Sequence, residues 1–150
     1  MRIRQHNGSV DIDISDARLR RNLKEAQKLL NMQVVADCDP LIPFQQGALI
    51  GSVEYPDGIY GGTIQWGGAS VGVPYAHYLY QGIKYGPNIP IKDSQGNITG
   101  WYSPPSKHPT GEKLKYHPEG TERGDHWFEK AKQQHKQEWI DLVKRTAGKE

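Results

Sequence analysis

Residues suited to a buried face recur at helical spacing in two long stretches, one near each end of the chain. The first predicts a helix over residues 16–35 that begins after the N-cap Ser15 and ends before Pro40, because proline lacks a backbone donor. The second predicts a helix over residues 125–146 with Asp125 as its N-cap. The buried stripe of the first helix would be Leu19, Leu23, Ala26, Leu30 and Val34, and that of the second Phe128, Ala131, His135, Trp139 and Leu142.

Turn sequences between stretches of apolar residues predict three antiparallel hairpins. The turns are Asn7-Gly8, residues 56–58 (PDG) and residues 93–96 (DSQG). Each contains glycine, which adopts positive φ without strain, beside residues that favour tight turns. The expected hairpins are an N-terminal one within residues 1–15, one with strands over 48–55 and 59–66, and one with strands over 89–92 and 97–102.

Residues 74–81 predict one short helix, with Pro74 in its first turn and Gly82 as a left-handed C-cap. We expect Tyr75 and Leu79 to pack this helix against the sheet. A side chain at either position would then belong to the core and contribute to stability.

Residues 103–120 predict a mobile, protease-sensitive loop, because four prolines interrupt strand pairing over most of this segment. The fold class that follows is α+β, in a single domain over residues 1–150. It combines a small antiparallel β-sheet with one long N-terminal helix, one short middle helix and one long C-terminal helix.

Composition limits the class of protein. The 150 residues are 35% hydrophobic and 9% aromatic, which predicts a folded chain with a modest core. A net charge of +2 lacks the basic footprint of a nucleic-acid-binding protein. Cys38 is the only cysteine, so an intramolecular disulfide is excluded and a reducing compartment is expected. Without a signal-like start or a run of about 18 apolar residues, we expect a soluble protein with no membrane contact.

One motif matches a hydrolase pattern. Residues 68–72 (GASVG) fit G-x-S-x-G with Ser70 as the nucleophile, and His77 and Asp93 could complete a triad. The motif belongs to folds with a parallel sheet, whereas this chain predicts antiparallel strands. We therefore expect no catalytic residue. A small serine hydrolase using Ser70 and a small nucleic-acid-binding module using the charged flanks stay as alternatives.

The histidines do not predict a metal site. Four of the six recur nine residues apart, at positions 108, 117, 126 and 135. Zinc ligands that share a turn or helix are about two to five residues apart. We therefore expect no metal and no cofactor.

Aromatic residues gather in a middle segment of low charge. Over residues 41–100 the formally charged side chains are only Glu54, Asp57, Lys84, Lys92 and Asp93. Two explanations stay open: the aromatic side chains fill a small core, or several of them face a neighbouring subunit, since interface cores are rich in aromatic residues. The residues concerned are Trp66, Tyr75, Tyr78, Tyr80, Tyr85 and Trp101.

Three segments resemble, in order and spacing, the minor capsid or tail-completion proteins that act at the head–tail junction of long-tailed bacteriophages. Residues 42–52 (IPFQQGALIGS) resemble the family's segment of Pro, a polar pair, Gly, a small residue and Leu. Residues 74–82 (PYAHYLYQG) resemble its Pro-Tyr-Ala helix ending in Gly. Residues 124–132 (GDHWFEKAK) resemble the start of its C-terminal helix, where a Trp-Phe pair precedes Ala.

The resemblance implies a structural virion protein without enzymatic activity that forms a ring, expected to be sixfold, at the tail's upper end or the neck. Its implied partners are further copies of itself and other neck, connector and tail proteins, with DNA present only in transit through the ring. It would lie in the host cytoplasm during assembly and in the virion afterwards. The expected structural or interface residues are Gly47, Leu49, Trp66, Tyr75, Tyr78, Leu79, Tyr80, Gly82, Trp101, Trp127, Phe128 and Trp139.

Overall fold

The computed structural model describes residues 2–7, 10–44, 47–116 and 120–150. The helices are α1 (Ala17–Cys38), α2 (Ala76–Gln81) and α3 (Trp127–Ala147), with short 3-10 turns η1 (Asp39–Leu41), η2 (Ile50–Ser52) and η3 (Ala69–Val71). The strands are β1 (Arg2–Asn7), β2 (Val10–Ser15), β3 (Ile83–Gly86), β4 (Ile89–Lys92), β5 (Ile98–Tyr102) and β6 (His108–Lys113). The α+β class is confirmed, but the strands described form three separate two-stranded antiparallel sheets rather than one small sheet.

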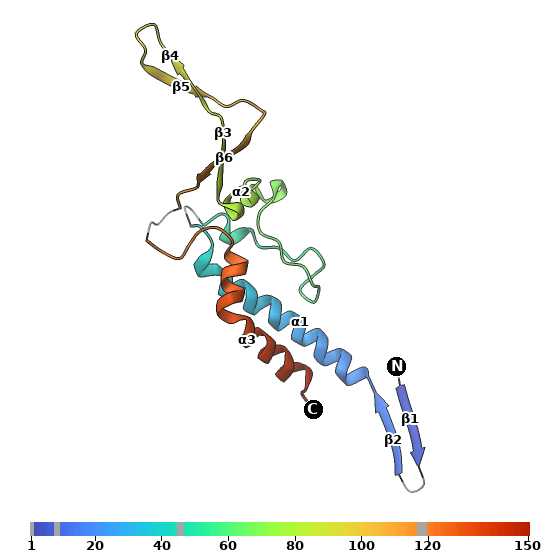
Figure 1. Ribbon diagram of the computed structural model, residues 1–150. Coiled ribbons are helices and arrows are strands. Elements are labelled where there is room, and N and C mark those ends of the chain that lie inside the picture. Colours follow the sequence, from blue (N-terminus) through green and yellow to red (C-terminus); the bar gives the residue numbers. More distant parts are fainter. Residues whose placement is uncertain (1, 8–9, 45–46, 117–119) are drawn as a thin grey trace.

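The two long helices pack side by side and antiparallel (Figure 1). Both agree with the prediction, and α1 continues three residues beyond its expected end at residue 35. Asn22, near the start of α1, donates through Nδ2 to the carbonyl oxygen of Ala147 at 3.2 Å. Because α3 ends beside Asn22, the first turn of α1 extends beyond it, and Leu19 in that turn is exposed. Leu23, one turn further along the expected stripe, is also exposed.

The core lies between α1, α3 and the turns that follow α1. Val34 and Cys38 of α1 are buried against Ala131 and Trp139 of α3. Burial raises the pKa of the Cys38 thiol to about 12, so the thiol stays protonated and unreactive at neutral pH. No helix in the described ranges has both the length and the apolar character needed to cross a membrane.

Both predicted N-caps of the long helices are wrong. Ser15 is the last residue of β2, and Asp16 occupies the N-cap of α1. His126, with a φ of 48°, occupies the N-cap of α3 in place of Asp125. The Asp125 carboxylate instead accepts a hydrogen bond from Lys130 Nζ at 3.0 Å, one turn into the helix. Asp125 therefore stabilises the first turn of α3 by bonding to the Lys130 side chain, and not by accepting backbone N–H groups as an N-cap would.

The strands predicted over residues 48–55 and 59–66 are wrong. This part of the chain contains the turn η2 and a single bridge between Glu54 and Gln65. A side chain of α1 replaces the expected ladder. The buried Asn31 amide donates through Nδ2 to the carbonyl oxygens of Ile59 and Gly61, each at 2.8 Å. Backbone acceptors that a hairpin would have paired are satisfied by the helix instead.

The short helix α2 follows the predicted segment. Gly82 adopts a left-handed conformation with a φ of 74°, and its N–H donates to the carbonyl oxygen of Tyr78 at 3.0 Å, as expected for a C-cap. Leu79 packs partly buried against the core. Tyr75 is exposed instead of packed, because it precedes α2 as its N-cap residue.

Residues 83–113 form a projecting two-stranded arm, in which β4 and β5 make the outer hairpin and β3 pairs with β6 nearer the body (Figure 1). The outer hairpin agrees with the prediction. The loop predicted over residues 103–120 is wrong where β6 pairs antiparallel with β3. Pro109 fits there because it lies opposite Tyr85 beside an irregularity in the register, on a strand with one neighbour. Thr110 Oγ1 donates to the carbonyl oxygen of Lys84 at 2.8 Å and joins the two strands.

Candidate functional site

An aromatic cluster joins α2, α3 and the segment before α2. Trp127, the first residue of α3, is only 3% exposed. Its ring meets the ring of Tyr80 at a centroid distance of 4.6 Å and that of Trp66 at 6.5 Å, both edge to face. Edge-to-face pairs add stability beyond the area that they bury. The Tyr80 hydroxyl also donates to the carboxylate of Glu129, so the cluster fixes α2 against the start of α3.

The segments that carry the resemblance to phage proteins meet beside this cluster. The N–H of His126 donates to the carbonyl oxygen of Tyr80 at 2.9 Å, which joins segment 124–132 to segment 74–82. Arg123, immediately before the third segment, donates through Nη1 to the carbonyl oxygen of Ile42 at 2.7 Å, in segment 42–52. Residues far apart in the chain thus form one structural junction.

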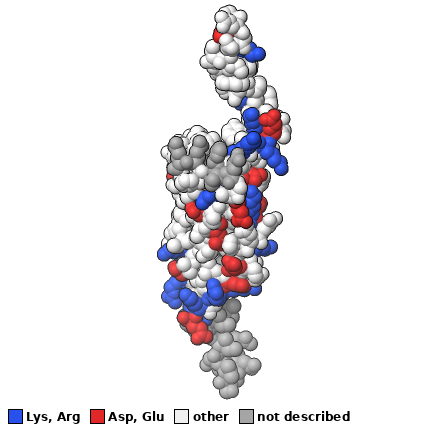
Figure 2. Space-filling model, turned by 90° about the vertical axis from the view of Figure 1, so that its left-hand side faces the viewer, with Lys and Arg blue, Asp and Glu red and all other residues white. Residues whose placement is uncertain are grey.

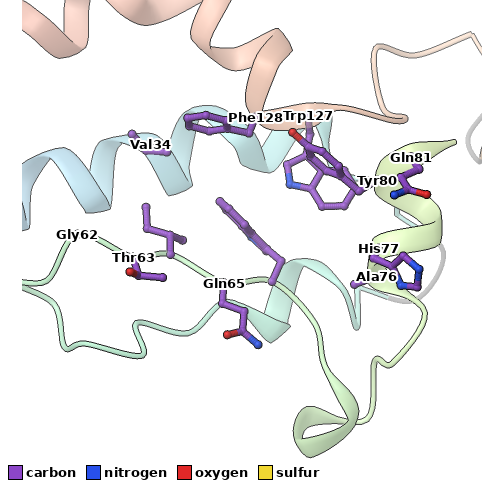
Figure 3. Close-up of a pocket in the computed structure, with 12 residues that line it drawn as sticks. Val34, Gly62, Thr63, Gln65, Ala76, His77, Tyr80, Gln81, Trp127 and Phe128 are labelled. Carbon is purple, nitrogen blue, oxygen red and sulfur yellow. The ribbon is translucent and has the colours of Figure 1, made fainter.

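An apolar cavity of about 570 Å³ lies between α1, the segment 62–66, α2 and the start of α3 (Figure 3). Its lining contains no Asp, Glu, Lys or Arg among the described residues. Gly62 lies at one end and Tyr80 at the other, with Phe128 and Trp127 opposite the 62–66 segment. A cavity of this size and lining accepts apolar side chains rather than a charged ligand.

The outer hairpin of the arm exposes large apolar side chains. Ile89, Ile91, Ile98, Trp101 and Tyr102 are between 46% and 62% exposed, with Trp101 the most exposed of them. β4 and β5 pack mainly against each other. Among the described residues, none of the helices packs extensively against either strand. An isolated two-stranded ribbon is marginal in water, so this arrangement is typical of a segment that packs against a partner.

Apolar residues lie on both faces of this ribbon. Ile89 is opposite Tyr102 and Ile91 is opposite Gly100, and these four positions share one face. Pro90 is opposite Trp101 on the other face. A ribbon that covers a core uses one apolar face and leaves the other polar. The outer hairpin therefore leaves apolar side chains exposed on both of its faces.

The expected structural and interface residues separate into two groups. Leu49, Trp66, Tyr80, Gly82, Trp127 and Trp139 are buried or packed in the body, with Leu79 partly buried beside them and Gly47 at the turn before η2. Tyr75, Tyr78, Trp101 and Phe128 are exposed. The first explanation, a small core, therefore holds for Trp66 and Tyr80, and the exposed aromatic residues stay candidates for a contact surface.

The residues of the hydrolase motif do not form a triad. Ser70 lies exposed on η3, and His77 lies on α2 with its ring against Tyr78. Asp93 lies in the turn at the tip of the arm, where it accepts the N–H of Gln95 at 2.9 Å. Among the described residues, no hydrogen bond or ion pair connects these three side chains, and the turn between β4 and β5 lies far from α2 (Figure 1).

A cluster of titratable groups between α1 and α3 is a feature that the sequence reasoning missed. One potential metal-ligand atom of each of Asp37, His135 and Glu138 lies within 4.8 Å of the other two, a spacing that a metal ion could bridge. His135 Nδ1 is 2.9 Å from a Glu138 oxygen and 4.0 Å from an Asp37 oxygen, and Trp139 Nε1 donates to Asp37 at 2.7 Å. The hydrogen bond with Glu138, aided by the Asp37 charge, raises the pKa of His135. The i, i+3 spacing of His135 and Glu138 was the available signal.

This raised pKa predicts a pH dependence of stability. Because the folded pKa of His135 exceeds its unfolded value, protonation of the folded state contributes stability below about pH 6.5. That contribution is lost as the pH rises through the folded pKa. We expect the difference in unfolding free energy between the wild type and His135→Gln to shrink between about pH 6 and about pH 8.5, measured by urea denaturation. A difference that stays constant over this range would contradict the ion pair.

Comparison with known proteins identifies no relative of this chain: no family model, no curated protein and no solved structure matches it.

Proposed function

We propose that this chain is a structural subunit of the virion of a long-tailed bacteriophage, where it completes the tail end or neck and joins tail to head as a ring of subunits. The observation that carries the proposal is the arm, a projecting ribbon whose apolar side chains are exposed on both faces. A chain with a modest core that leaves these side chains in water is suited to assembly.

The junction of the three resembling segments supports the same function. Their shared residues are structural in this chain: Gly82 caps α2, and Trp127 anchors α3 in the aromatic cluster. A side chain at Gly82 would place its Cβ 2.8 Å from Cβ of Asp125, so glycine is required for the close approach. The likeness to the phage proteins thus falls on residues that build the fold, as expected for a family defined by architecture and assembly.

A ring requires a heterologous interface, in which one surface of each subunit meets a different surface of the next. The arm and the apolar cavity of the body supply two such different surfaces in one chain. The proposed partners are other copies of this chain and the neck, connector and tail proteins. No covalent chemistry is part of the proposal.

The charge distribution predicts weak binding to DNA. Positive and negative side chains alternate over the face of the body in Figure 2, and the arm beyond its base is almost uncharged. A ring that the genome traverses would benefit from such a surface, because a continuous basic stripe would hold the phosphates. We expect duplex DNA to bind no more tightly than about 10⁻⁴ to 10⁻⁶ M at physiological salt. Submicromolar binding that weakens steeply with salt would favour the nucleic-acid alternative.

Localisation in the particle tests the proposed function. Antibody-gold labelling of purified virions of the encoding phage is expected to mark the head–tail junction, and mass spectrometry of the same particles should detect the chain. A chain that is abundant in infected cells but absent from purified virions would contradict the proposal.

A further inference from the structure

We infer that the outer hairpin of the arm of one subunit inserts into the apolar cavity of a second copy of this chain. The two surfaces are the β4–β5 ribbon and the cavity between α1, segment 62–66, α2 and the start of α3. The inference rests on the proposed function, because it names the partner that the arm meets in the ring.

The arm lacks enough contacts of its own to cover its apolar side chains. Complete burial of its two exposed aromatic and three exposed isoleucine side chains would remove roughly 500 Å² of surface from water. That is a large share of the about 800 Å² that each partner buries in a standard interface. The ribbon alone therefore brings most of the area of a specific contact.

Nucleic acid and membranes fit the arm poorly. Between residues 85 and 106 the only formally charged side chains are Lys92 and Asp93, which gives no basic surface for phosphates. The same two residues lie toward the tip, where Lys92 is paired with Ile98 and Asp93 begins the turn. Hydrogen bonds from the backbone of Asn97 and Gln95 lower the pKa of Asp93, so the tip stays ionised. A membrane would have to bury this charged turn before it reached Trp101.

The cavity of the body matches the ribbon in character. Both are largely apolar: the described cavity lining carries no formal charge, and Lys92, the last residue of β4, is the one formally charged residue in the two strands of the ribbon. Trp66 and Phe128 supply aromatic surface in the cavity. Trp101 and Tyr102 supply aromatic surface on the arm. A cavity of about 570 Å³ is large enough for side chains of this size.

The contact has to form between two molecules. The arm extends beyond α2 in the direction away from α1 and α3, whereas the cavity lies on the other side of α2, against those helices (Figures 1 and 3). An arm therefore cannot reach the cavity of its own subunit. Because the two surfaces differ, each subunit offers one arm and one cavity, and the contact continues from copy to copy until a ring closes.

Two variants separate the arm from the cavity. Trp101→Glu places a charge on an exposed arm position and leaves the body intact. Gly62→Trp fills the cavity from a position where an added Cβ meets no atom within 4 Å. The matched controls are Gly51→Trp, which is equally open but outside the cavity, and Gln95→Glu, which adds a charge at the polar tip. Circular dichroism melting checks that each variant folds.

Sedimentation velocity at concentrations up to about 100 µM reads the assembly. We expect the wild type and both controls to form species larger than a dimer, and each test variant alone to remain a monomer. An equimolar mixture of the two test variants should form a dimer and stop there, because only one intact arm and one intact cavity can meet. Such termination is expected only of a heterologous arm-to-cavity contact.

Three results would overturn the inference: a wild type that is monomeric at every concentration, a Gly62→Trp variant that assembles as the wild type does, or a mixture that stays monomeric. None of these results bears on the proposed function, which the antibody-gold labelling of virions tests separately. Conversely, a terminated dimer from a chain that is absent from virions would uphold the contact and reject the phage role. The two failures are therefore distinguishable.

Discussion

Replacement of Trp127 by alanine is expected to destabilise the protein by about 3–5 kcal/mol. Trp127 is 3% exposed and meets the rings of Trp66 and Tyr80, so truncation removes a buried indole and leaves a void between α2 and α3. Because domains of this size have roughly 5–15 kcal/mol of stability, the variant would be partly unfolded near body temperature. The measurement is the free energy of unfolding from urea denaturation followed by far-UV circular dichroism.

Trp101→Ala is the matched control for this prediction. Trp101 is 62% exposed on the arm, so the isolated chain should lose less than about 1 kcal/mol when its side chain is truncated. A large loss at Trp101 with little change at Trp127 would mean that the arm, and not the aromatic cluster, stabilises the fold.

Gly67→Ala is expected to cost about 2–5 kcal/mol, an unusually large effect for one methyl group. The φ of Gly67 is +78°, and an added Cβ would lie 2.2 Å from Cβ of Ala76 on α2. The Gly67 N–H also donates to Ser52 Oγ at 2.8 Å, so the backbone is held in this position. A methyl group there has to push α2 away from segment 62–67. Thermal denaturation should show a clear fall in the melting temperature.

A second substitution tests the proposed clash. In the double variant Gly67→Ala, Ala76→Gly the opposing methyl group is absent, so stability should recover in part, and the remaining loss reflects the positive φ and the 3.0 Å approach to the Val73 carbonyl oxygen. Gly62→Ala, where an added Cβ meets no atom within 4 Å, should be tolerated. If Gly67→Ala melts like the wild type, α2 does not pack as described.

The long helices were predictable because their apolar periodicity extends over many turns. Local pattern also predicts α2 and the outer hairpin, because Gly82 ends α2 and the turn at residues 93–96 reverses the chain between β4 and β5. The extent of burial was less predictable. The pattern of α1 predicts that Leu19 is buried and gives no sign that α3 ends beside Asn22, where Leu19 is exposed.

The strands predicted over 48–66 failed for a tertiary reason. Their alternating pattern resembles a hairpin, but the Asn31 amide takes up the carbonyl groups of Ile59 and Gly61. An amide in the middle of a helix carries no local sign of a partner 28 or 30 residues away. Strand β6 is not predicted because the prolines of this segment disfavour a strand, while its pairing with β3 has no local sign in the sequence.

For the candidate site, the sequence predicts which types of residue are present but not which of them are buried and which are exposed. The low charge and aromatic content of residues 41–100 indicate either core or contact surface, and the pattern alone does not separate the packed Tyr80 from the exposed Tyr78. The exposure of Trp101 depends on the arm leaving the body after Gly82, which places apolar residues on a ribbon with two free faces. The cavity was not foreseen, since its lining comes from four segments distant in sequence.

Electron microscopy of particles assembled without this chain tests the central claim most directly. The gene is deleted from the encoding phage or prophage, and the lysate is compared with one in which the wild-type chain is supplied from a plasmid. The account predicts filled or empty heads and finished tails that are not joined, with joined virions restored by the plasmid. Normal, infectious virions produced without the chain would contradict it.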